Sequence, residues 1–399
     1  MSWLHKDNSL GVSLSHRAIE MLEAEHQPDG RMILRSLSEA LLEEGVFNHT
    51  KVLDIDRLAA ALEKVHQAAA PKRFSTNELH IALPDSVTYF HVFRFPGSLN
   101  DKEVENALSF QIEEVIPVPL KDLRSDFAVV SRESDQTIIL YAAVLKEVVE
   151  QIEKAVVRAG LKVGSIGLES EALARVLLGE SNDHASLIVD IGERTTTFIV
   201  RDRLGLRFIF NSDTAGGDLT EAVMTLKNIP KKKAEAIKQK IGVEKSKDVR
   251  VSRVLIRQVA KLAERIVEVI DWVEAKEGCS PLSEVVLTGG TSEMPGIIPE
   301  LEKHLTQERP KLNVRHGDAF EHVADSPLIT KLKKNHMASQ FAPALGMLFL
   351  GPEEQRRFKL VLGESEKEDV EKGFRWKELA GIVFFGIAIG TFVAAMIVI

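Results

Sequence analysis

A short run near the middle of the chain has the residue types and spacing needed to hold a phosphate beside a metal ion. The apolar strand Leu187–Asp190 ends in a carboxylate, and Ile191–Arg194 follows as a turn that contains a glycine. Such a turn presents backbone N–H groups to an anion, while Asp190 faces the metal. The same pattern also fits an ordinary surface hairpin, so this interpretation depends on the rest of the chain.

Two glycine pairs occur where a predicted strand ends and a predicted helix follows. Gly216-Gly217 opens a helix after the strand Leu206–Asn211, and Gly289-Gly290-Thr291 follows the strand Ser283–Thr288. Glycine at such places lets a ligand ring approach the backbone closely. One pair alone is a weak signal, because many turns contain two glycines.

The elements that must position these residues form a pattern that occurs twice. Three strands and a helix are predicted from Leu10 onward, with the helix capped by Asp54 or Asp56, and three strands and a helix follow again from Leu187. Duplicated lobes around a cleft are a common way to enclose a nucleotide. The order therefore predicts an α/β protein with two lobes.

A different pattern lies between the two lobes, from Phe74 to Ala159. Strands and two helices alternate there, and Ile116-Pro117 ends the first helix because proline cannot continue it. We interpret this segment as a small α+β module inserted into the first lobe. Farther along, Lys231–Lys247 is expected to be solvated helix surface, and Val251–Glu274 a long amphipathic helix.

Composition excludes several functional classes. A chain of 399 residues exceeds one ordinary core, and its net charge of -8 gives no reason to propose nucleic acid as a partner. The single cysteine, Cys279, excludes an internal disulfide framework and fits a reducing compartment. No Ser/His/Asp triad, zinc-ligand spacing or dinucleotide fingerprint is present.

The C-terminal residues predict a membrane anchor. Leu379–Ile399 contains 21 residues without a charge, and at about 1.5 Å per residue this length crosses a hydrocarbon core of roughly 30 Å. Lys372, Arg375 and Lys377 precede it, which indicates that the globular part is cytoplasmic. A buried core helix is the alternative. The chain is either tail-anchored or the first part of a longer protein.

The combined motifs resemble those of a known family. LIVDIGERTTTFIV, TAGGDLTEAV, VVLTGGTSEMPGI and QFAPALGMLFLG resemble the second phosphate loop, its following helix, the adenosine loop and the closing helix of actin-like nucleotide-binding proteins. FQIEEVIPVPLKDLRSDFAVV and GLKVGSIGLESEALARVL resemble the PilM type IV pilus assembly family, which is related to FtsA. The resemblance implies a two-lobed actin-like fold, ATP and Mg²⁺ as cofactors, and a PilN-like membrane protein and cytoplasmic motor ATPase components as partners.

The resemblance also implies which residues form the site, and where the site departs from the family. The first phosphate loop of the family usually reads Gly-Ile-Asp-Ile-Gly-Ser, and serine replaces its aspartate and second glycine here. Because phosphoryl transfer depends on a metal, we expect weak hydrolysis at most and assign no catalytic residue. The nucleotide-binding residues so implied are Ser13, Ser15, His16, Asp190, Gly192, Glu193, Thr195, Gly216, Gly217, Gly289, Gly290 and Thr291, with Asp190 as the metal-facing acid.

The tail departs from the family as well. The apolar segment Phe358–Leu362, a polar spacer and the apolar stretch from Leu379 reproduce the order of elements in PilN. We expect Phe358, Leu360 and Leu362 either to dock onto the inserted module as an added strand or to belong to a plain tether. GspL of type II secretion combines similar parts. An assembly scaffold is therefore the first interpretation, with an active actin-like ATPase and a GspL-like component as alternatives.

The patterns described above predict six segments along the chain. It consists of the first part of lobe one (1–73), the inserted module (74–160), the return segment of lobe one (161–185), the second lobe (186–352) with a helical subdomain (221–278), a polar linker (353–378) and a transmembrane helix (379–399).

Overall fold

The structure is a computed structural model. No helix in the described part of the chain combines enough length with enough apolar character to cross a bilayer. The linker 353–378, the segment that contains Phe358, Leu360 and Leu362, and the predicted anchor 379–399 lie outside the described residues. The described ranges are 8–27, 31–48, 51–132, 134–178, 184–244, 248–275, 280–307 and 309–349.

The first lobe is built on a five-stranded mixed sheet. β1, β2 and β3 form an antiparallel meander, whereas β4 and β8 run parallel to β1, in the order β3-β2-β1-β4-β8. Central strands of this kind are buried on both faces and are therefore almost continuously apolar. The strands are β1 (Asn8–Leu14), β2 (Ala18–His26), β3 (Met32–Leu41), β4 (Glu78–Leu83) and β8 (Lys162–Leu168).

The second lobe repeats the same sheet. Its order is β11-β10-β9-β12-β13, again a three-stranded meander followed by two parallel strands. The duplication predicted from the sequence is therefore confirmed at the level of strand order. The strands are β9 (Ala185–Ile191), β10 (Thr196–Asp202), β11 (Gly205–Ser212), β12 (Leu282–Thr288) and β13 (Asn313–His316).

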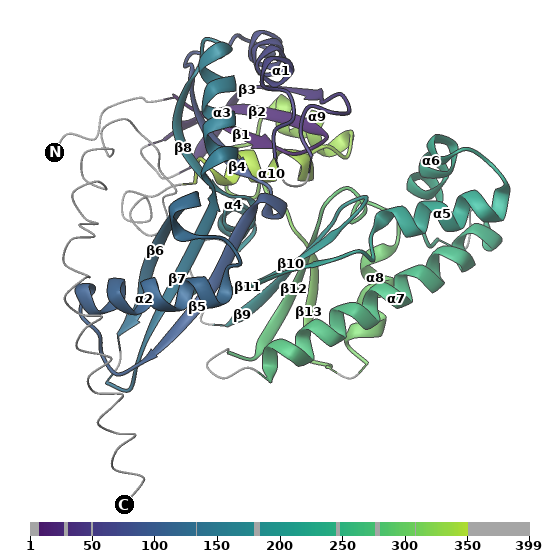
Figure 1. Cartoon of the computed structure of the whole chain (residues 1–399). Helices are drawn as coiled ribbons and strands as arrows, with labels where there is room; N and C mark the ends of the chain where they lie inside the picture. The colour runs from purple at the N-terminus through teal and green to yellow at the C-terminus, as the bar shows by residue number, and fades with distance from the viewer. Residues whose placement is uncertain are drawn as a thin grey trace, which may run out of the picture. The chain divides into compact units, whose positions relative to one another are not determined.

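Between β4 and β8 the chain forms a separate antiparallel sheet of three strands, β5-β7-β6. The helix α2 lies across one face of this sheet (Figure 1) and buries Val104, Leu108 and Ile112 against it. A capping box between Asn100 and Glu103 starts α2. The elements are β5 (Thr88–Pro96), α2 (Asp101–Val115), β6 (Leu123–Arg132) and β7 (Gln136–Leu145).

The structure differs from the predicted module 74–160 at its first strand. β4 falls within those residues, yet it pairs with β1 and β8 in the sheet of the first lobe. Its apolar run fits either location, because periodicity shows how a strand is buried but does not show which strand it pairs with. The last helix of the range, α3 (Lys146–Arg158), packs on α1 (Ile55–Gln67).

The remaining helices cover the two large sheets. α4 (Glu169–Leu178) packs against α10 (Ala342–Gly346), and α10 also contacts β1. In the second lobe, α5 and α6 pack on each other and on the long α7, whose apolar face joins the core. The second-lobe helices are α5 (Gly216–Lys227), α6 (Lys231–Ile241), α7 (Val249–Glu274) and α8 (Ile297–Leu305). The predicted second lobe 186–352 extends too far, because α9 (Pro327–Lys334) contacts β3 of the first lobe and α10 contacts β1 (Figure 1). Single 3₁₀ turns occur at Asp85–Val87, Leu120–Asp122 and Ser339–Phe341.

Candidate functional site

The turn between β9 and β10 has the geometry of an anion-binding loop. The N–H of Gly192 donates to the carbonyl of Thr195 at 3.0 Å, which closes the turn. The N–H groups of Glu193, Arg194 and Thr195 have no hydrogen-bond acceptor among the described residues. Successive backbone N–H groups in such a turn bind phosphate oxygens.

Gly216 and Gly217 hold this turn in place. At the start of α5 their N–H groups donate to the carbonyl oxygens of Gly192, at 2.9 Å, and Glu193, at 2.7 Å. A Cβ on Gly216 would lie 2.0 Å from the hydroxyl of Thr291, so a larger residue cannot replace it without moving the loops apart. These two glycines therefore support the anion-binding turn through their backbone.

The loop after β12 completes the second-lobe part of the site. Gly289 has a φ of +83°, and a Cβ there would lie 2.3 Å from Oδ1 of Asp190. The N–H of Thr291 donates to the carbonyl of Ile191 at 3.2 Å, so the two loops are joined by a backbone hydrogen bond. Gly290 is exposed, with open space beside it where a ligand ring could lie against the backbone.

The first loop is closed on itself. The hydroxyl of Ser15 accepts hydrogen bonds from the N–H groups of Arg17, at 3.3 Å, and Ala18, at 3.0 Å, and donates to the carbonyl of Ala18 at 3.2 Å. A phosphate at this turn would need the same N–H groups. Ser13 is buried and hydrogen-bonds Glu20, its cross-strand neighbour on β2, and His16 is half-buried.

Four carboxyl groups gather near the ends of these strands. Burial raises the pKa of Glu20 to about 8. Burial, followed by the charge of Asp85, raises the pKa of Asp190 to about 6. The pKa of Asp85 is raised to about 6, chiefly by burial, although a hydrogen bond from Ser170 opposes the change. Burial and the other three carboxylates raise the pKa of Glu169 well above its usual range.

Sequence reasoning identified only Asp190 of these four acids. Asp85 follows β4, and Glu169 follows β8, so two acids stand at the carboxyl ends of parallel strands, where ligands commonly bind. Their position at the strand ends is the sequence feature that could have identified Asp85 and Glu169 as site residues. By surface area Asp85, Glu169 and Asp190 are half-buried, so they remain accessible at the site even though burial dominates their pKa values.

Within the described ranges, no group of three or more His, Cys, Asp or Glu side chains is placed so that it could hold a metal ion. Mg²⁺ is usually bound by one or two carboxylates together with substrate phosphates and water. Asp190 beside an anion-binding turn fits that manner of binding. The carboxylate would supply one ligand and the phosphates the others.

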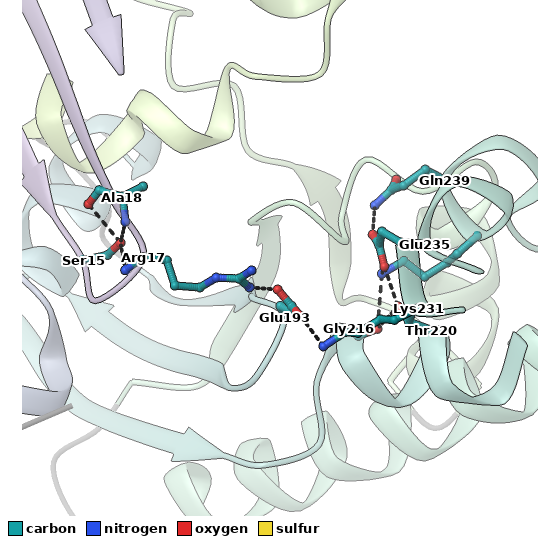
Figure 2. A network of polar contacts seen from close by, with 10 residues as sticks. Ser15, Arg17, Ala18, Glu193, Gly216, Thr220, Lys231, Glu235 and Gln239 are labelled. Carbon is teal, nitrogen blue, oxygen red and sulfur yellow. Dashed lines mark hydrogen bonds and ion pairs between the residues drawn. The ribbon is translucent and has the colours of Figure 1, made fainter. Parts of the chain in front are cut away.

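Polar side chains on α6 form a cluster that contacts both glycine loops (Figure 2). The ammonium of Lys238 donates to the carbonyl of Gly216 at 3.2 Å and pairs with Glu235 at 2.9 Å. The carboxylate of Glu235 also accepts a hydrogen bond from Thr220, and Gln239 donates to the carbonyl of Gly290 at 3.3 Å. α6 thus ties both glycine loops to one helix.

Burial lowers the pKa of Lys238, whereas hydrogen bonds from Thr220 and Lys238 lower the pKa of Glu235 despite its burial. The expectation that Lys231–Lys247 is solvated surface is wrong at Lys238, whose side chain is 2% exposed. The sequence does not indicate that Lys238 is buried, because it lies among other lysines and a run of like charges is typical of an exposed face.

Residues 11–349 match the family described as Type IV pilus assembly protein PilM. The cell division protein FtsA of Enterococcus faecalis (strain ATCC 700802 / V583) is 24% identical over 352 residues, which cover 76% of this chain and 78% of that protein.

Two solved structures share the fold. A PilM-PilN type IV pilus biogenesis complex matches with a TM-score of 0.71 and 22% identity, over 87% of this chain and 100% of that chain. The ethanolamine utilization protein EutJ from Carboxydothermus hydrogenoformans matches with a TM-score of 0.50 and 18% identity, over 87% of this chain and 91% of that chain.

Proposed function

Because the chain belongs to the type IV pilus assembly protein PilM family and has a mixed α/β actin-like fold, we propose that it is an assembly scaffold. In this proposal it is tethered to the inner membrane and binds a PilN-like membrane protein. It links that protein to the cytoplasmic motor ATPase. It also binds nucleotide with Mg²⁺ as a structural ligand and hydrolyses it slowly at most.

The observation that carries the proposal is the contrast between the loops. The turn after Asp190 keeps three N–H groups without an acceptor among the described residues, and Gly290 leaves open space for a ligand. The first loop, in contrast, uses its N–H groups on Ser15. Such a site can bind phosphate through the second loop. Hydrolysis would also need groups from the first loop aimed at the charge that develops in the transition state.

The residues present fit a nucleoside polyphosphate. The β9–β10 turn would bind phosphate oxygens, Asp190 would face Mg²⁺, and the carboxylate of Glu235, whose side chain is 40% exposed, offers an acceptor suited to a ribose hydroxyl. When bound, Mg²⁺ neutralises the phosphates. The chain itself orients the ligand and joins the loops around it.

Thermal unfolding of the full-length chain with and without Mg-ATP tests binding, because a ligand specific for the folded state raises the unfolding midpoint. We expect a saturable upward shift that Asp190→Ala removes. Co-purification with PilN-like and motor components tests the scaffold role. A chain that shows neither the shift nor a specific partner contradicts the proposal.

An active ATPase is the second candidate. It is favoured by the acids Asp85 and Glu169 near Asp190, because a buried carboxyl with a raised pKa is a common general base. Steady-state turnover separates the candidates. Rapid hydrolysis that Asp85→Asn and Glu169→Gln abolish, without loss of nucleotide binding, would favour the enzyme.

We also propose that the inserted module docks an extended segment. β6 is an edge strand of its sheet, and no strand within the described ranges pairs with its outer edge. An edge of this kind can accept an added strand, either from a PilN-like partner or from Phe358–Leu362 of the chain itself. Hydrogen exchange tests self-docking, since unprotected amides across Phe358–Leu362 in the full chain rule it out.

A further inference from the structure

The second loop carries a carboxylate that holds two cations from different parts of the fold. One oxygen of Glu193 pairs with Arg17 in the β1–β2 loop, and the other lies 2.7 Å from the ammonium of Lys231 at the start of α6. Figure 2 shows Arg17 extended from its loop toward Glu193. The side chains remain accessible, with 52% of Arg17, 60% of Lys231 and 31% of Glu193 exposed.

These three side chains lie at the anion-binding turn. Glu193 is the first of the three consecutive residues whose N–H groups lack an acceptor among the described residues. Its carbonyl is held by Gly217 at 2.7 Å, so the backbone stays fixed while the side chain reaches the cations. The arrangement therefore consists of two cations and a row of N–H donors, with a carboxylate in the place that an anionic ligand would take.

Folding stability does not explain why Glu193 pairs with both Arg17 and Lys231. Ion pairs between accessible side chains contribute little, because water screens them and ordering long side chains costs entropy. An anionic ligand gives a better reason. Arginine and lysine beside backbone N–H groups are the usual donors to phosphate, and a polyphosphate carries more charge than one carboxylate.

We propose that Arg17 and Lys231 form a two-cation phosphate site spanning the first loop and α6, and that the carboxylate of Glu193 is its displaceable internal occupant. A polyphosphate takes both cations and releases Glu193 toward solvent. Arg17 thereby gives the first loop a role in binding that its closed turn does not provide. The inference rests on the proposed function only for the nucleoside part of the ligand.

Inorganic tripolyphosphate, titrated calorimetrically into the full-length chain, tests the phosphate site without a nucleoside. Glu193→Gln keeps the size of the side chain but removes the competing charge. We expect this variant to bind tripolyphosphate roughly fivefold more tightly than the parent, the gain of one exposed charge contact. A gain in affinity cannot arise from misfolding.

The double variants assign the gain to the two cations. Arg17→Gln or Lys231→Gln in the Glu193→Gln background should cancel it, because each removes a donor to the ligand. Lys233→Gln is the matched control, since it removes the same charge from an exposed position two residues along α6. It should leave the gain intact.

Two results would overturn the inference: Glu193→Gln binding tripolyphosphate no more tightly than the parent, or a gain that survives both double variants. The nucleotide proposal is tested separately from the phosphate site. If Glu193→Gln gains affinity for tripolyphosphate through Arg17 and no variant binds ATP or ADP, the phosphate site stands and the nucleotide proposal does not. If ATP binds equally to all variants, the phosphate site is wrong.

Discussion

The side chain of Glu20 shows how single residues set the charge of the site. It stands opposite Ser13 on the neighbouring strand, is 8% exposed, and has a pKa of about 8 because burial penalises its charged form. Near neutral pH Glu20 is therefore mostly protonated. A neutral carboxyl adds no repulsion toward phosphate, so the site is less negative than its four acids suggest.

Glu20 predicts how stability depends on pH. In the folded state it holds a proton up to about pH 8, whereas the unfolded chain releases that proton above its ordinary pKa of 4.5. Stability is therefore lost as pH rises through this window, by about 1.4 kcal/mol per pH unit for one proton. We expect Glu20→Gln to flatten the slope in denaturant titrations between pH 5 and pH 8. The exposed Glu105→Gln is the control, and an unchanged slope in Glu20→Gln contradicts the assignment.

The buried ion pair between Asp202 and Arg207 predicts a large effect on stability. The two side chains are 3% and 0% exposed, 3.5 Å apart, within the β10–β11 hairpin. Asp202→Ala leaves the guanidinium buried without this carboxylate, which should cost about 3 to 5 kcal/mol of unfolding free energy. Glu268→Ala breaks the exposed pair with Arg265 and should cost under about 1 kcal/mol. Equal costs in denaturant titrations would show that burial of the pair has no energetic role.

At the scale of elements, α10 shows why the C-terminal part of the lobe is rich in small residues. A Cβ on Gly346 would lie 2.0 Å from the carbonyl oxygen of Ala172 in α4, and one on Gly11 would lie 2.0 Å from the carbonyl oxygen of Ala344. α10 thus contacts both α4 and β1 at backbone distance. This contact joins the end of the family match to its first strand.

Gly346→Ala should therefore destabilise the first lobe by about 1 to 3 kcal/mol or more, because the methyl group meets backbone that cannot rotate away. Thermal unfolding of the full chain measures the effect. Gly290→Ala is the matched control, since nothing lies within 4 Å of its added methyl group. If both variants unfold at the parental temperature, the close approach of α10 to α4 is incorrect.

Elements of this fold were largely predictable, whereas their partners were not. The meander Leu187–Asn211 and the helix after Gly216 follow from alternation and turn residues, and the structure confirms them as β9, β10, β11 and α5. The location of β4 was missed, because pairing depends on the whole sheet. Asp85, Glu169 and the buried Lys238 were missed for a similar reason, since their roles arise from contacts with residues far apart in sequence.

At the scale of the whole molecule, the proposed tether predicts how the chain fractionates. If the apolar stretch from Leu379 spans the membrane, the full chain should stay with membranes after alkaline extraction. A chain truncated after Pro352 should be released while it keeps the thermal unfolding of the folded body. Release of the full chain under the same conditions would contradict the tether, whereas retention of the truncated chain would indicate another membrane contact.

We propose that this actin-like body binds nucleotide to hold its loops together and does not consume it rapidly. Measuring equilibrium binding of Mg-ATP and its hydrolysis on one preparation of the full-length chain tests that claim most directly. We expect saturable binding that Asp190→Ala weakens, with hydrolysis close to the uncatalysed background. Rapid turnover that disappears in Asp190→Ala, or no binding by the parent chain, would contradict it.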